Sequence, residues 1–73
     1  MRAAILITTT GFPGEVLGAV RGVAGVEEAH LLMGVYDVVA IVGAEDEAGL
    51  KRIASAIRAI PGVMTTTTLL YIT

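Results

Sequence analysis

The sequence predicts an α+β domain with the element order βαββαβ. Apolar, β-branched segments alternate along the chain with segments whose apolar residues have the spacing of a helix face. The pattern Arg-x-x-x-Gly-Val occurs twice, beginning at Arg21 and at Arg58, so the two copies are 37 residues apart. A chain of 73 residues is long enough for one small domain. We therefore interpret residues 1–73 as a single domain built from two βαβ units.

The first half contains a strand, a helix and a second strand. Residues 2–9 are apolar and β-branched, which predicts a strand. Pro13 begins a helix, because the first helical turn tolerates a missing N–H. This helix is predicted to extend to about Val23, with an apolar face of Val16, Leu17, Val20 and Val23. Gly25 ends it, since glycine readily adopts the left-handed conformation, and residues 26–33 are predicted to form a strand.

The second half repeats this order. Residues 36–42 are predicted to form a strand. Asp46 is the expected N-cap of the second helix, with Glu45 and Glu47 beside the positive end of the helix dipole. The helix ends before Pro61, and its apolar face consists of Leu50, Ile53, Ile57 and Ile60. Residues 63–72 are predicted to form the last strand.

Two βαβ units with right-handed crossovers give a four-stranded antiparallel sheet with both helices on one face, which is the ferredoxin-like fold. The first and last strands have apolar side chains on both faces, whereas two helices cover one face. The chain is 55% hydrophobic and only 16% charged, against about 25% charged residues in an average domain. We therefore expect the second face to pack against the sheet of another copy in a homodimer.

Composition argues against several classes of function. No segment has the ~18–20 apolar residues of a membrane span and no signal peptide is recognisable, so we expect a cytoplasmic protein without membrane contact. With no cysteine and a single histidine, His30, we expect no metal site, and nothing indicates a cofactor. The net charge of −2 argues against direct binding of nucleic acid. The absence of Asn, Gln, Cys and Trp is typical of thermophiles, although a GC-rich genome produces a similar bias.

Catalytic groups are scarce, and we predict that the chain is not an enzyme and has no catalytic residue. Ser55 lies within the second helix and His30 on a strand, so no nucleophile is placed beside a base. The acidic stretches at 27–28 and 45–47 are interpreted as a solvated turn and a helix start. The turn at residues 11–14 precedes a helix, but it has no Lys or Arg to hold a phosphate.

The connection Gly34-Val35-Tyr36-Asp37 is the strongest candidate for a binding site. Asp37 interrupts an apolar stretch, where a charge is costly unless it lies at a turn, a wet interface or a ligand site. The β-branched Val35 disfavours the positive φ of a tight two-residue hairpin, so we expect a longer loop. From these residues alone, Asp37 is equally a polar turn residue or a carboxylate that receives an ammonium group at a subunit boundary.

Several short segments together resemble one known family: Pro13-Gly14, Gly25-Val26, Gly34-Val-Tyr-Asp37, Asp46 with Leu50, and Pro-Gly-Val-Met-Thr-Thr-Thr-Thr at 61–68. They resemble the effector domain of the Lrp/AsnC (feast/famine) transcription regulators, called RAM for regulation of amino-acid metabolism. The resemblance covers essentially all 73 residues. It implies a domain that dimerises sheet to sheet, assembles into a ring of dimers, and binds small effectors, usually amino acids, between dimers.

Carried over to this sequence, the resemblance implies an effector site made of Gly34, Tyr36, Asp37, Thr66 and Thr68. The carboxylate would bind an α-ammonium group, and hydroxyl and loop N–H groups would bind the α-carboxylate. Two departures matter: Met33 stands where family members commonly have Thr, and the first strand begins at once, without the family's N-terminal helix-turn-helix. The resemblance therefore implies a stand-alone effector module that co-assembles with full-length Lrp/AsnC-type regulators rather than binding DNA itself.

Two other interpretations stay open. The stretch Phe12-Pro13-Gly14, between the first strand and the first helix, is similar to the loop at which ACT-like regulatory domains bind amino acids. The third interpretation is a small dimeric α/β-barrel enzyme that uses His30 or Tyr36. Loss of ligand binding on Asp37→Ala would favour the RAM interpretation over the ACT-like one, and loss of a turnover on changing His30 would favour the enzyme.

Overall fold

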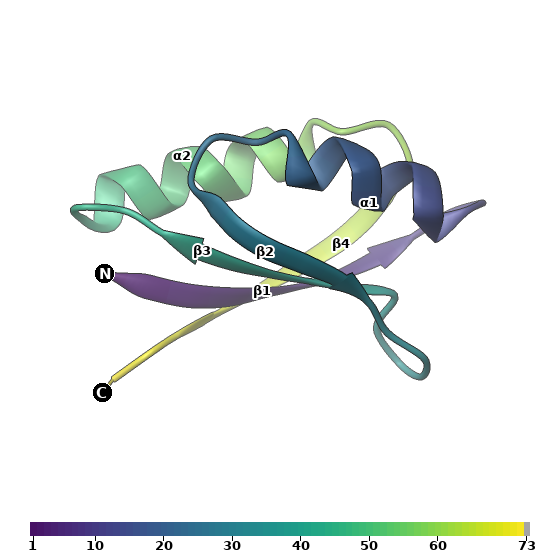
Figure 1. Ribbon diagram of the computed structural model, residues 1–73, viewed down its shortest axis with the longest axis horizontal. Helices are drawn as coiled ribbons and strands as arrows, with labels where there is room; N and C mark the ends of the chain where they lie inside the picture. Colours follow the sequence, from purple (N-terminus) through teal and green to yellow (C-terminus); the bar gives the residue numbers. More distant parts are fainter. Residues whose placement is uncertain (73) are drawn as a thin grey trace.

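The computed structural model describes residues 1–72 and has the predicted order βαββαβ. The elements are β1 (Arg2–Thr9), α1 (Pro13–Arg21), β2 (Val26–Leu31), β3 (Val38–Gly43), α2 (Glu47–Arg58) and β4 (Val63–Leu70). The strands form one antiparallel sheet in the order β2-β3-β1-β4, and both helices lie on the same face of it (Figure 1). This arrangement confirms the ferredoxin-like fold.

The core lies between the helices and one face of the sheet. Alternate residues of the two central strands are completely buried there: Ala3, Ile5 and Ile7 of β1, and Val38, Ala40 and Val42 of β3. The helices contribute Val16 and Val20 from α1 and Leu50, Ile53 and Ile57 from α2. Since burial of one large aliphatic side chain contributes about 1.5–3 kcal/mol, this layer is the main source of stability within one copy.

The other face of the sheet carries apolar side chains that no helix covers. Ala4, Leu6, Val39 and Ile41 are half-buried at its centre, and Leu69 and Tyr71 are 51% and 44% exposed. In Figure 1 this face is turned away from both helices. The prediction of apolar residues on both faces is confirmed, while the sheet-to-sheet homodimer stays a prediction.

The two helices begin differently. The side chain of Asp46 accepts a hydrogen bond of 2.8 Å from the backbone N–H of Gly49, which confirms it as the N-cap of α2. Helix α1 starts at Pro13 without any side-chain cap. Its end was predicted about two residues too late, at Val23, because tight turn bonds from Gly22 to Ala19 and from Val23 to Val20 close the last turn. Gly25 then reverses the chain with a φ of +98°.

Three strand ends were predicted too far into the connections. β2 ends at Leu31 rather than at residue 33, and β3 begins at Val38 rather than at residue 36. The reason is that the Asp37 N–H bonds to the carbonyl of Ile7 on β1, which leaves residues 32–37 as a loop. β4 ends at Leu70 rather than at residue 72. The Tyr71 N–H still bonds to the carbonyl of Arg2, but β1 begins at that residue and provides no strand partner beyond it. Within residues 1–72, neither helix is long and apolar enough to cross a membrane.

Candidate functional site

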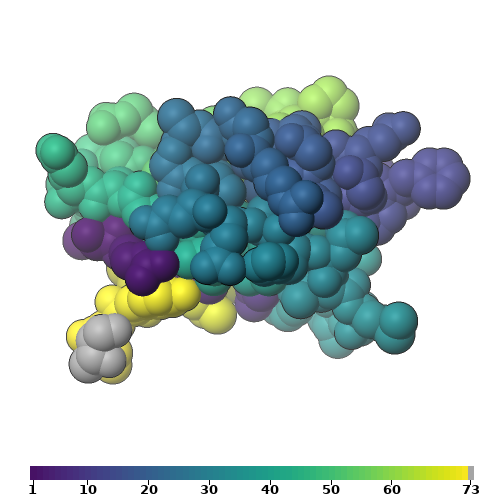
Figure 2. Space-filling model, in the orientation of Figure 1, coloured from purple at the N-terminus to yellow at the C-terminus, as the bar shows by residue number. Residues whose placement is uncertain are grey.

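The loop between β2 and β3 contains three of the predicted effector-site residues. It projects from one end of the sheet, at the lower right of Figure 1, and stands out from the surface in Figure 2. Gly34 is exposed and has a φ of +141°, a backbone conformation that side chains rarely allow. Its neighbours Met33 and Val35 are 102% and 85% exposed. Tyr36 and Asp37, at the base of the loop, are half-buried.

The Asp37 carboxylate joins this loop to the end of β1. Its Oδ2 accepts a hydrogen bond of 2.8 Å from the Thr9 N–H and one of 3.3 Å from the Thr9 hydroxyl. The Asp37 backbone is also fixed, since its N–H bonds to Ile7 and its carbonyl accepts from Leu32. These bonds explain an acidic residue at this point of an apolar stretch. Oδ1 takes part in none of the hydrogen bonds found within residues 1–72, so half of the carboxylate is left for another donor.

Thr66 and Thr68 lie on a different part of the surface. Their partners across the sheet are Ile7 and Ile5, so their side chains are on the helix face. Thr66 is half-buried, and Thr68 is exposed in a hollow of ≈ 280 Å³ between α2 and β4. Val38, the neighbour of Asp37, and Thr66 lie on opposite sides of β1. Their backbones are therefore two strand spacings, or about 10 Å, apart. One chain therefore does not bring the two threonines into contact with the loop.

The hollow beside Thr68 contains charged residues that the sequence analysis did not single out. Lys51 and Arg58 line it from α2, together with Glu47 and the apolar residues Leu50, Ala54 and Leu70. Lys51 and Arg58 are seven residues apart, or about two helical turns. This spacing in the sequence indicates that both side chains lie on the same side of the helix. The Lys51 ammonium is 3.6 Å from the Glu47 carboxylate, and both side chains are largely exposed.

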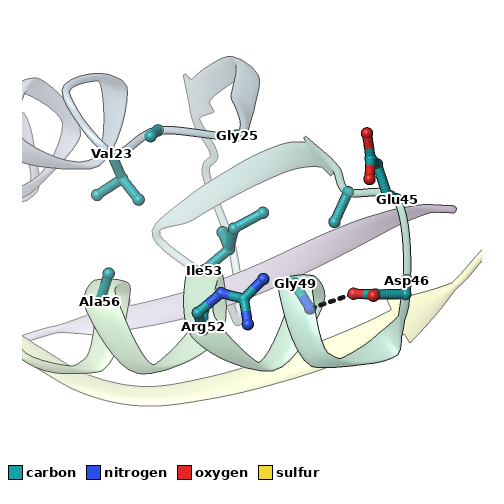
Figure 3. Close-up of a pocket in the computed structure, with 10 residues that line it drawn as sticks. Val23, Gly25, Glu45, Asp46, Gly49, Arg52, Ile53 and Ala56 are labelled. Carbon is teal, nitrogen blue, oxygen red and sulfur yellow. Dashed lines mark hydrogen bonds between the residues drawn. The ribbon is translucent and has the colours of Figure 1, made fainter.

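A larger hollow, of ≈ 550 Å³, lies at the opposite end of the sheet from the loop. Figure 3 shows its lining: Val23 and Gly25 from the turn after α1, Asp46 from the start of α2, and Arg52 and Ile53 from the middle of that helix. The dashed line marks the bond by which Asp46 caps the helix. None of the predicted site residues lines this hollow.

The groups considered for catalysis or metal binding are dispersed. His30 Nε2 lies 2.9 Å from Glu28 Oε1, with both side chains more than half exposed, on β2 at the uncovered face. Ser55 is exposed on α2. In the part of the chain that the structure describes, no three His, Cys, Asp or Glu side chains are grouped so as to hold a metal ion.

The structure is a small α+β domain with an uncovered sheet face and an exposed loop that is apolar at its tip and has the Asp37 carboxylate at its base. Residues 2–73 match the family model described as the Lrp/AsnC ligand binding domain. The chain therefore belongs to the Lrp/AsnC ligand-binding domain family. This is a family of regulatory effector-binding modules and not an enzyme family.

Solved structures support the same assignment. A protein of Thermus thermophilus is 30% identical with a TM-score of 0.91, over 99% of this chain and 92% of that one. A hypothetical protein from Pyrococcus horikoshii is also 30% identical, with a TM-score of 0.86, over 99% and 89% of the two chains. FFRP-DM1 is 29% identical with a TM-score of 0.88, over 97% of each chain.

The fold is also shared with a longer regulator. AsnC of E. coli has a TM-score of 0.89 at 20% identity, and the match covers 99% of this chain and 50% of AsnC. At that identity the likeness shows the fold alone. No curated protein matches the chain.

Proposed function

We propose that the chain is an oligomeric amino-acid-binding module that regulates transcription or amino-acid metabolism. One observation carries the proposal: the Asp37 carboxylate lies at the base of an exposed loop, and its Oδ1 accepts no hydrogen bond from residues 1–72. A carboxylate so placed can accept a charge-assisted hydrogen bond from an α-ammonium group. The exposed backbone around Gly34 offers N–H groups to an α-carboxylate.

The proposed site is completed between copies of the chain. Thr66 and Thr68 are separated from Asp37 by β1, so they can contribute to the same site only where two copies meet. The uncovered apolar sheet face supports a first contact, a sheet-to-sheet dimer, because contiguous exposed apolar surface marks an interaction site. We propose that such dimers assemble further into a ring.

The proposal extends to the partners and the setting. The effector is a free amino acid, and full-length Lrp/AsnC-type regulators are the proposed protein partners, because they contain the same domain fold. Regulators of this kind act in the cytoplasm, and we place the chain there. Similarity to a Thermus thermophilus protein, together with the lack of Asn, Gln and Cys, supports a thermophilic origin.

A thermal-shift screen with the twenty amino acids tests the function. A ligand present at 100 times its Kd stabilises the folded state by about 2.7 kcal/mol, so at least one amino acid should raise the Tm. The matched variants are Asp37→Asn, which removes the charge, and Asp46→Ala, which alters a carboxylate at the far end of the sheet. The shift should disappear in the first variant and persist in the second. No shift with any amino acid would overturn the proposal.

Light scattering tests the assembly. The wild-type mass at micromolar concentration should exceed that of one chain. Leu6→Glu puts a charge at the centre of the uncovered face and should lower the mass, because burial of an unpaired carboxylate is costly. Glu15→Lys on α1, away from that face, is the control and should leave the mass unchanged. A wild-type mass equal to one chain would contradict the dimer.

An ACT-like site is the second candidate, and the exposure of Phe12 favours it. This side chain is 80% exposed at the turn between β1 and α1, where an apolar ligand could cover it. The same screen separates the two candidates. If Phe12→Ala abolishes the shift and Asp37→Asn retains it, the ligand binds at the turn between β1 and α1 rather than at the loop between β2 and β3.

A further inference from the structure

The two arginines of the internal repeat have different surroundings. Arg21 ends α1 and Arg58 ends α2, and a cation is favourable at both places because it lies at the negative end of a helix dipole. Arg21 also donates two hydrogen bonds, of 3.2 and 2.8 Å, to the carbonyl of Ala29 on β2. The repeat spacing of 37 residues makes Thr66 on β4 the counterpart of Ala29. No side chain of residues 1–72 donates to the Thr66 carbonyl, so Arg58 does not have the structural role of Arg21.

The Arg58 side chain instead lines the hollow of ≈ 280 Å³ between α2 and β4. Lys51 lines the same hollow, and Thr68 contributes a hydroxyl group from β4. Neither the Arg58 guanidinium nor the Thr68 hydroxyl takes part in a hydrogen bond or ion pair found within residues 1–72. Lys51 has one ionic contact, with the Glu47 carboxylate at 3.6 Å, and both of these side chains are largely exposed. An exposed pair of this kind contributes little to stability, so the Lys51 ammonium can turn to another anion.

The charge and the size of the hollow restrict what it can bind. Its charged residues are two cations and one carboxylate, so the hollow has a positive balance in a chain whose net charge is −2. Leu50, Ala54 and Leu70 supply an apolar wall. The volume of ≈ 280 Å³ corresponds to about nine water molecules. This combination suits a small anion in which a carboxylate is attached to a short aliphatic chain.

The hollow adjoins the proposed effector site through Thr68. In that proposal the Asp37 carboxylate receives the α-ammonium group of an amino acid. The exposed N–H groups around Gly34, with a threonine hydroxyl, receive its α-carboxylate. The main-chain charges of the ligand are then balanced without Lys51 and Arg58, so these two cations are left for the ligand's side chain.

We propose that the effector is an acidic amino acid, aspartate or glutamate, whose side-chain carboxylate binds to Arg58 and Lys51 in the hollow beside Thr68. The planar guanidinium can donate to both oxygens of that carboxylate, and the ammonium adds a second positive charge. The methylene groups of the ligand lie against Leu50 and Leu70. This inference rests on the proposed function, because it names the class of amino acid that the same site takes.

A comparison of acidic amino acids with their amides tests the inference. Glutamate and glutamine have nearly the same size and differ in side-chain charge, and so do aspartate and asparagine. Calorimetric titration of the wild-type protein should give at least one acid a Kd about tenfold or more below that of its amide, because hydrogen bonds between charged groups are the stronger ones. Equal Kd values, or binding of neutral amino acids alone, would overturn this inference and leave the proposed function standing. Binding of no amino acid at all would overturn both.

Variants of two arginines on α2 locate the preference for the acid over its amide. Arg58→Gln should remove about tenfold of this preference, whereas Arg58→Lys keeps the charge and should retain most of it. Arg52→Gln is the matched control, because it removes a cation of the same helix that lines the other hollow. Both arginines are exposed, so circular dichroism should show folded protein in every case. If Arg58→Gln keeps the preference, or if Arg52→Gln lowers it equally, the inference is overturned.

Asp37→Asn separates the two ends of the ligand. Since Asp37 is assigned to the α-ammonium group, this variant should weaken the binding of an acid and of its amide by similar factors. The ratio of the two Kd values should therefore stay near the wild-type ratio, although both values rise. A loss of preference as large as that in Arg58→Gln would contradict the assignment of the side-chain carboxylate to the hollow.

Discussion

An aspartate and a glycine occur at each end of the sheet, at the start of α2 and at the loop between β2 and β3, but their surroundings differ. At the start of α2, Asp46 accepts the Gly49 N–H at 2.8 Å, and the nearby Gly25 has a φ of +98°. At the loop between β2 and β3, Asp37 accepts the Thr9 N–H at 2.8 Å, and Gly34 has a φ of +141°. A Cβ at Gly25 would lie 2.9 Å from Ile53 Cγ1, whereas a Cβ at Gly34 would meet nothing within 4 Å.

The folded chain alone accounts for the residues at the start of α2. It accounts only in part for those of the loop between β2 and β3. Gly25 is required both by its backbone conformation and by the close approach of Ile53. Asp46 is an ordinary helix cap. The loop with Gly34 and Asp37 is exposed and apolar at its tip, and Oδ1 of Asp37 accepts no hydrogen bond within the part of the chain that the structure describes. Packing within one chain does not account for the exposed apolar tip or for the Asp37 oxygen, whereas contact with a ligand or with a second copy would account for both.

The largest effect is expected for Gly25→Ala. Backbone strain costs about 1–3 kcal/mol, and the clash with Ile53 adds about 1–3 kcal/mol of overpacking. Gly34→Ala meets no neighbour, so it should lose only the strain contribution. Urea unfolding of both variants measures the difference in free energy of unfolding. Equal losses would mean that the end at α2 is less tightly packed than the structure indicates.

Asp37→Ala should cost about 1–3 kcal/mol of unfolding free energy, because the half-buried Thr9 N–H loses its acceptor. Asp37→Asn keeps an oxygen acceptor for that N–H and should retain most of the stability. Chemical denaturation of the two variants shows whether the hydrogen bond or the charge matters for folding. If Ala and Asn cost the same, the bond to Thr9 is not what fixes this loop.

Asp46→Ala is expected to cost about 0.5–2 kcal/mol, the usual loss on removing a helix cap. The helix has further support from its buried face of Leu50, Ile53 and Ile57, so it should still form. Helical circular dichroism and thermal unfolding measure both points. Loss of the whole helix signal would mean that the cap, rather than burial, holds α2 in place.

The smallest effect on stability is expected for Met33→Thr, at the tip of the loop. A fully exposed side chain away from caps and packing changes the unfolding free energy by less than about 0.5 kcal/mol. The added hydroxyl should strengthen the binding of the amino acid that gives a thermal shift. Calorimetric titration measures the change in Kd, and weaker binding by the variant would show that Met33 itself contacts the ligand.

The parts of this molecule that could be predicted from sequence are those fixed by local patterns. The start of α2 at Asp46 and the turn after α1 at Gly25 are predicted by residues a few positions away. The repeat at Arg21 and Arg58 predicts the topology. The ends of β2 and β3 could not be predicted, because they depend on a bond from the Asp37 N–H to the carbonyl of Ile7, on a strand far away in the sequence.

The candidate site shows the same limit. Periodicity places Thr66 and Thr68 on one face of β4, but the sheet order decides that β1 separates them from Asp37. The hollow beside Thr68 follows from that order as well. No pattern within a single strand contains this information.

The most direct test of the central claim is the stabilisation by an amino acid of wild-type protein and of Asp37→Asn, each at 100 times the wild-type Kd. The account predicts about 2.7 kcal/mol for the wild type and a loss of most of this in the variant, while the variant without ligand stays folded. An equal stabilisation of both proteins would show that the Asp37 carboxylate serves only to fix the loop, and the proposed site would be wrong.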